Sequence, residues 1–97
     1  MELVQNNMME IIAVSQNLLI NCVNNETPIG IHIHEKDSLI RNSMIVREFS
    51  LKINELYVAG DWFELSVDEV IIDIQYIEED DSIYILFKDK EIYLDLC

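Results

Sequence analysis

The chain has 97 residues, 51% of them hydrophobic, and its 19 acidic and 6 basic side chains give a formal net charge of −13. This length suits one domain with a modest core, and the apolar content excludes a disordered acidic tail. A strongly negative surface repels nucleic acid and anionic lipid and attracts basic proteins, so direct binding to DNA, RNA or a membrane is not expected.

The longest apolar-looking stretch, residues 8–23, is interrupted by five polar side chains and is too polar to span a membrane. The N-terminus lacks the basic start of a secretion signal, and Cys22 and Cys97 do not suggest a disulfide framework or a zinc knuckle. A bias toward Ile, Asn, Glu and Asp indicates an AT-rich genome, as in many low-GC bacteria and their phages. We expect one domain over residues 1–97 that acts in the cytoplasm of a bacterial host.

The charge is distributed unevenly along the chain. Residues 1–60 hold 7 acids and 4 bases, a net of −3, whereas residues 61–97 hold 12 acids and 2 bases, a net of −10. A solvated turn explains some of this acidity, but it accounts less well for twelve acids in the last third. The C-terminal part is therefore where contact with a basic partner is expected.

The first predicted element is a helix over residues 4–23. Its apolar side chains recur at three- and four-residue spacings and define one face: Val4, Met8, Ile11, Ile12, Ser15, Leu18, Leu19, Cys22 and Val23. Asn24 and Asn25 are stop signals, and Pro28 prevents continuation. A strand over residues 10–22 is the alternative, because alternate residues there are apolar as well.

Strand patterns follow from Pro28 onward. Residues 28–35 alternate isoleucine with glycine and histidine, and after a polar break residues 39–58 are strand-like without a clear register. Residues 59–61 predict a turn in which Gly60 supplies a positive φ. The alternation that follows turns Trp62 away from the apolar side of its strand, although a tryptophan is also a common core residue.

The last part of the chain predicts a three-stranded meander. If residues 78–81 form a four-residue loop, Ile77 pairs with Ser82, and Tyr76 then pairs with Ile83. If Asp89 and Lys90 form a two-residue turn, Phe87 pairs with Ile92 and Ile85 with Leu94, although Asp-Lys is not a preferred turn and a longer one is the alternative. Both hairpins place the same residues on one buried face, which specifies the register: Ile72, Ile74, Tyr76, Ile83, Ile85, Phe87, Ile92, Leu94 and Leu96.

The patterns together predict an α+β domain. One N-terminal helix precedes an antiparallel sheet of five or six strands that ends in the three-stranded meander. An all-β barrel, with a strand in place of the helix, is the alternative fold.

Motifs that would mark an enzyme or a cofactor site are missing from the sequence. It has no Gly-rich phosphate loop, nucleophile elbow, His-Glu-x-x-His or Cys-x-x-Cys pattern. His32 and His34 have a spacing that two metal ligands can use, but no third and fourth ligand is evident nearby. Residues 78–81 lack the pattern of a calcium loop. We therefore expect no enzymatic activity, no cofactor and no metal site.

Two features suit protein binding. Trp62, if exposed beside acidic residues, would be an anchor residue for a partner. The outward side of the meander interleaves tyrosines with carboxylates, which an arginine-rich surface would accept if the helix does not cover it. The candidate contact residues are Asp61, Trp62, Glu64, Asp68, Glu69, Glu78, Glu79, Asp80, Asp81, Tyr84 and Tyr93.

In size and charge the chain resembles phage-encoded anti-CRISPR proteins and other DNA-mimic inhibitors. The resemblance implies an inhibitor that occupies the nucleic-acid-binding groove of a basic nuclease or effector, with carboxylates in place of phosphates. The alternatives are an immunity protein that neutralises a cognate toxin, and a structural or assembly module whose acidity serves solubility. An unpaired edge strand would also allow a homodimer.

Overall fold

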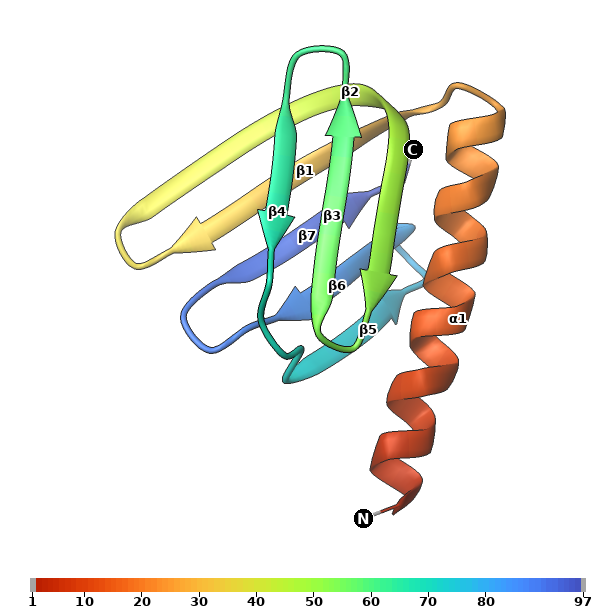
Figure 1. Ribbon diagram of the computed structural model, residues 1–97, viewed down its shortest axis with the longest axis vertical. Helices are drawn as coiled ribbons and strands as arrows, with labels where there is room; N and C mark the ends of the chain where they lie inside the picture. The colour runs from red at the N-terminus through yellow and green to blue at the C-terminus, as the bar shows by residue number, and fades with distance from the viewer. Residues whose placement is uncertain (1, 97) are drawn as a thin grey trace.

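The computed structural model describes residues 2–96, with side chains from residue 7 onward. One helix, α1 (Glu2–Asn24), precedes seven strands (Figure 1). The strands are β1 (Pro28–Glu35), β2 (Ser38–Lys52), β3 (Glu55–Gly60), β4 (Glu64–Val67), β5 (Asp73–Ile77), β6 (Ser82–Leu86) and β7 (Glu91–Asp95). The predicted α+β class is confirmed, with more strands than the five or six expected.

The strands form one antiparallel sheet in the order β4-β3-β2-β1-β7-β6-β5. β4 and β5 are its edges, so the sheet is open and the alternative of a closed barrel is wrong. It folds over on itself, so that β3, β4 and the second half of β2 lie in front of the remaining strands in Figure 1. The inward side chains of both layers belong to a single core cluster.

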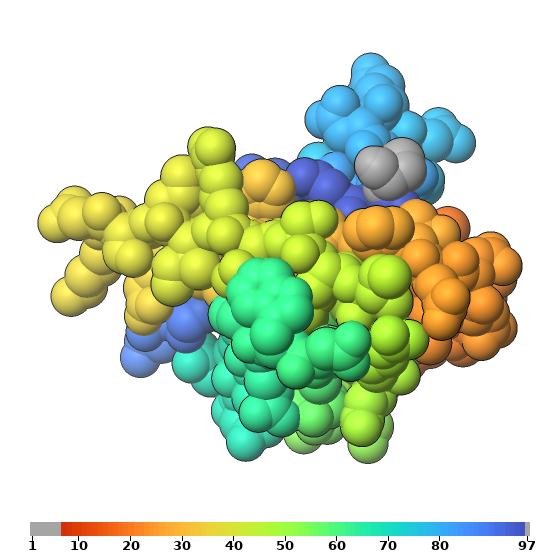
Figure 2. All heavy atoms as spheres, turned by 90° about the horizontal axis from the view of Figure 1, so that it is seen from above, coloured from red at the N-terminus to blue at the C-terminus, as the bar shows by residue number. Residues whose placement is uncertain are grey.

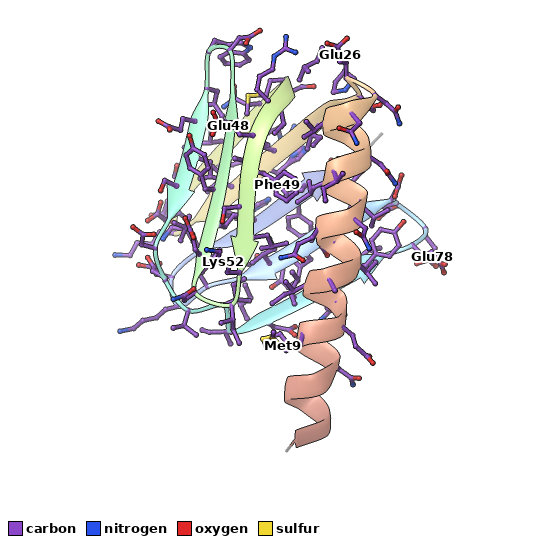
Figure 3. The ribbon with its side chains drawn as sticks, turned by 45° about the vertical axis from the view of Figure 1, so that its right-hand side comes forward. Met9, Glu26, Glu48, Phe49, Lys52 and Glu78 are labelled. Carbon is purple, nitrogen blue, oxygen red and sulfur yellow. The ribbon has the colours of Figure 1, made fainter. Side chains whose placement is uncertain are left out.

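The helix forms because its apolar positions recur at helical spacing. Ile12, Ser15, Leu19 and Cys22 are buried, at intervals of three and four residues, and the alternative of a strand in this region is wrong. α1 contacts β2 and β5 and covers the side on which the folded sheet is open (Figure 1). Phe49 of β2 lies between the sheet and the helix (Figure 3). Within residues 2–96, no helix has the length and apolar character that crossing a membrane requires.

β2 connects the two layers. Its residues 38–45 pair with β1, whereas its residues 46–52 pair with β3, and a bulge between Val46 and Glu48 bends the strand between the two partners. Gly60 ends β3 opposite Val46, at the bend. A β-carbon on Gly60 would lie 2.5 Å from Met44 Sδ and 2.8 Å from the Ile45 carbonyl oxygen. Gly60 is therefore required for close packing, and the prediction that it supplies a positive φ is wrong.

The first hairpin of the meander has the predicted register, and the second is shifted. Ile77 pairs with Ser82, but Leu86, and not Lys88, pairs with Glu91. The second turn therefore has four residues, 87–90. Within it, the Phe87 N–H donates to the Lys90 carbonyl at 2.9 Å. A shift of two residues leaves each side chain on its predicted face. Seven of the nine residues predicted to be buried are buried.

The other two residues of that predicted face differ for local reasons. Tyr76 is half-buried, and its hydroxyl donates to Asp81 Oδ1 at 2.6 Å. Ile72 is 54% exposed, while its neighbour Ile71 is buried at 2%. β5 begins only at Asp73, so the strand alternation does not extend back to Ile72. The backbone N–H of Ile71 instead donates to the Ile53 carbonyl at 2.7 Å, which turns its side chain into the core.

We predict that Gly60→Ala destabilises the fold by roughly 1–3 kcal/mol, since the added methyl group meets a backbone oxygen that cannot move aside. Gly30→Ala is the matched control. Its β-carbon would lie 3.4 Å from Asp95 Cβ, an ordinary contact, and the expected change is within about 0.5 kcal/mol. Urea unfolding measures both free energies, and equal losses would contradict the close-packed bend.

Candidate binding site

The outward side of β1, β7, β6 and β5 is not covered by the helix. The buried side chains of α1 pack into the core on the inner side, where Cys22 Sγ lies 3.8 Å from the Leu96 carbonyl oxygen. Tyr84 and Tyr93 are half-buried on the outward side. We call this surface the outer face, and the register assigns to it His32, His34, Asp73, Gln75, Ile77, Ser82, Tyr84, Leu86, Glu91, Tyr93 and Asp95.

A tyrosine pair lies at the centre of the outer face. The shift in the second hairpin places Tyr84 opposite Tyr93, where the sequence predicted Asp95, and their ring centroids are 5.0 Å apart. The Tyr84 hydroxyl donates to Glu91 Oε2 at 3.0 Å. Burial, and secondarily this hydrogen bond to a carboxylate, raises the pKa of Tyr84 to about 12. Tyr84 is therefore a neutral donor that holds Glu91 in place.

Beside the tyrosines, polar contacts centred on Asp95 cross three strands. Asp95 of β7 accepts a bond from Ser82 Oγ at 2.5 Å and lies 2.9 Å from His32 Nε2 of β1. Gly30 lies opposite Asp95 on β1. The carboxylate lies between the serine and the histidine, so the imidazole cannot remove a proton from the serine. The arrangement orients Asp95 and does not activate a nucleophile.

A hollow of about 580 Å³ lies over these contacts of Asp95. Its lining joins the outer face to the loop between β5 and β6: His32, His34, Ile77, Asp80, Ser82, Tyr93 and Asp95. The rings of His34 and Tyr93 meet edge to face at 5.7 Å. Among the described residues, no group of three or more His, Cys, Asp or Glu side chains could hold a metal ion. The chemistry available in the hollow is that of carboxylates beside aromatic rings.

The predicted acidic loop, residues 78–81, projects from the end of the β5–β6 hairpin. Glu78, which points away from the body in Figure 3, is exposed, as are Glu79 and Asp80. Within residues 2–96, no basic side chain forms an ion pair with any of these three. Asp81 differs: it has a φ of 53°, accepts from Tyr76, and its carbonyl binds the Leu96 N–H at 2.9 Å. Asp81 therefore helps to fix the backbone conformation of the loop.

Trp62 lies in the turn between β3 and β4 and is 64% exposed, which confirms that it points away from the core. Its neighbours have partners within the protein. Arg47 reaches Asp61 and Glu26, each at 3.3 Å, and the two carboxylates raise the pKa of Arg47. The Tyr57 hydroxyl donates to Glu64 at 2.8 Å, which raises the pKa of Tyr57. The turn therefore presents the exposed ring of Trp62, while the carboxylates of Asp61 and Glu64 already have partners within the protein.

Asp68 and Glu69 follow β4, at the opposite end of that strand from Trp62. Glu69 pairs with Lys90 at 3.2 Å, whereas Asp68 is exposed. The predicted contact residues therefore do not form one surface. The structure joins Asp80 to Tyr93 through the hollow, and it separates both from the Trp62 turn and from residues 68–69.

The sequence-based prediction did not include several residues of this site. His32 and His34 were considered only as metal ligands, Glu91 and Asp95 only as carboxylates on the outward side of the meander, and Ser82 was not a candidate. Only the pairing of β1 with β7 brings His32 to Asp95, and no local pattern indicates that pairing. No protein-family model matches the chain, and neither a curated protein nor a solved structure matches it.

The tyrosine pair has a measurable consequence. The pKa of Tyr84 rises from 10.0 to about 12 on folding, so its neutral form stabilises the fold fully below pH 10, and this contribution is lost as the pH rises toward 12. We predict that the ultraviolet absorbance of tyrosinate shows a late ionisation step that Tyr84→Phe removes. Glu91→Gln should shift that step to lower pH, because it removes a charged acceptor. Because the pKa of Tyr57 is also raised, the comparison is repeated in Tyr57→Phe, and a late step that persists in Tyr57→Phe/Tyr84→Phe would contradict the assignment.

Proposed function

We propose that this protein is a non-enzymatic acidic binding protein that inhibits a basic nuclease or effector by occupying its nucleic-acid-binding groove, in the manner of anti-CRISPR and other DNA-mimic inhibitors. The observation that carries the proposal is the continuity of the acidic loop with the outer face. Asp80 lines the same hollow as Asp95 and Tyr93. We place this action in the cytoplasm of a bacterial host.

The acidic loop supplies the charge for this role. Glu78, Glu79 and Asp80 are exposed and have no ion-pair partner within the described chain, whereas Asp61, Glu69 and seven other acids face a basic group or a tyrosine hydroxyl. An exposed carboxylate without a partner loses no internal interaction when it meets a basic groove. Such charges chiefly raise the association rate and make binding sensitive to salt.

The hollow supplies contacts for a single basic side chain. A guanidinium group that enters it meets the carboxylates of Asp80 and Asp95, and the ring of Tyr93 offers a face for cation–π contact. Ser82 and His32 hold Asp95 by one oxygen each, so the carboxylate is oriented before a partner arrives. Preorganisation of this kind lowers the entropic cost of binding.

The test begins with capture of partners from bacterial lysate at low and high salt, followed by mass spectrometry. Three proteins serve as bait: the wild type, the loop variant Glu78→Gln/Glu79→Gln/Asp80→Asn, and the control variant Glu10→Gln/Glu35→Gln/Glu48→Gln. Both variants lose three exposed charges, so they have equal net charge. Asp81 is left unchanged in both, because its side chain belongs to the fold.

We predict that the wild type and the control capture a nucleic-acid-processing enzyme that duplex DNA displaces. The loop variant should bind that enzyme roughly tenfold more slowly at low salt, with a weaker salt dependence. Equal association rates for the two variants would show that the loop is not part of the interface. Capture of a toxin that DNA does not displace would favour an immunity protein, and capture of nothing would refute inhibition.

A further inference from the structure

The hairpin of β1 and β2 projects from the body as an arm (Figure 2). All eight residues from 34 to 41 are exposed, although they lie within a regular hairpin. We call residues 34–45 the arm. Over its part of β2, residues 38–45, the only neighbouring strand in the described structure is β1, because β3 joins β2 only from Val46 onward. One edge of the arm is therefore an unpaired strand edge.

The register shows which backbone groups are unpaired. Glu35 pairs with Ser38 across a two-residue turn, in which Lys36 has a φ of 53°. In such a hairpin every second residue of a strand directs its N–H and C=O toward the partner strand. The even-numbered residues of β2 therefore face β1, and Leu39, Arg41 and Ser43 direct their backbone groups away from the protein.

The side chains of the arm do little to protect this edge. Leu39 is 46% exposed and Ile40 is 44% exposed, and the two point to opposite faces of the strand. From Ser38 to Val46 the strand has no proline and no acid, and its single charge is Arg41. Long edges of this kind are usually blocked by proline, by several charges or by a covering segment, because they pair readily with another strand.

We propose that this edge pairs with the same edge of a second copy of the chain, antiparallel about a twofold axis at Ile40. The second copy is the fitting occupant for a reason of charge. Most of the surface of a chain with net charge −13 repels its copy, whereas residues 38–46 carry a charge of +1. Closed twofold contacts require a self-complementary surface, which an antiparallel strand edge provides.

The axis at Ile40 is the register that suits both backbone and side chains. It places Ile40 opposite Ile40 of the second copy, and Leu39 opposite Arg41, so that outward-directed backbone groups meet one another. Arg41 of one copy is then diagonal to both Asp37 and Arg41 of the other, so the two arginines are staggered and each has an acid within reach of its long side chain. An axis at Arg41 would set two arginines opposite each other, which is unfavourable.

The pairing has a consequence for the outer face. The twofold axis of an antiparallel strand pair is perpendicular to the sheet, so the outer faces of the two copies lie on the same side. The contact involves a short edge, and interfaces well below about 1,000 Å² are weak. The fraction of dimer should therefore rise with protein concentration and fall on dilution. This inference is independent of the proposed function, because the acidic loop is not part of the arm.

Sedimentation equilibrium of the full chain tests the proposal. The wild type should shift from a mass of 11.4 kDa toward twice that value as concentration rises. Ile40→Asp sets two like charges at the axis, and Arg41→Pro removes an outward N–H that the hairpin does not use. Both variants should remain monomeric with an unchanged circular dichroism spectrum. Ile72→Asp is the matched control, since Ile72 is an exposed isoleucine outside the arm, and it should dimerise like the wild type.

Two outcomes would overturn the proposal. A wild type that stays monomeric at all concentrations excludes pairing between copies. Binding of the arm to a strand of another protein would not rescue the proposal, because that is a different contact. A dimer that survives in both arm variants but dissociates in Ile72→Asp places the interface elsewhere. The loop variant Glu78→Gln/Glu79→Gln/Asp80→Asn should dimerise normally, so a failure of inhibition and a failure of dimerisation are distinguishable.

Discussion

The fold depends on β2 belonging to two layers at once. One strand of fifteen residues pairs with β1 over its first half and with β3 over its second. The bulge after Val46 lets the strand bend, and Gly60 lets β3 approach the bend closely. Because the sheet folds over itself there, the inward side chains of both layers form one core, and a single helix is enough to close its open side.

This bend also decides what faces outward. With the core enclosed between the layers, the alternate residues of β1, β7, β6 and β5 are left on a surface that the helix does not reach. Polar and aromatic side chains at these positions can therefore interact across strands, as Tyr84 does with Tyr93 and Asp95 with His32. The outer face is a by-product of core formation, but its hydrogen bonds hold its carboxylates in fixed positions.

The helix and the meander could be predicted from sequence because their signals are local. Alternation fixes which face a residue takes, so a hairpin shift of two residues changed the partner of Tyr84 without changing its face. Ile72 was misplaced because strand alternation was extended beyond the start of β5, into a segment bonded to Ile53. The pairing of β1 with β7, and with it the contact between His32 and Asp95, joins residues far apart in sequence, so periodicity could not predict it.

The distribution of charge separates two kinds of contact on this molecule. Arg47, Lys52 and Lys90 are engaged with nearby acids in the described structure, so internal pairing leaves the acidic loop with its full charge. The same acidity repels other copies from much of the surface, and the β2 edge of the arm, with Arg41 and no acid between Ser38 and Val46, lacks this repulsion. An acidic protein that must attract a basic partner without self-associating at random needs such a division, because long-range repulsion disfavours self-contacts between acidic surfaces and spares an edge that carries no acid.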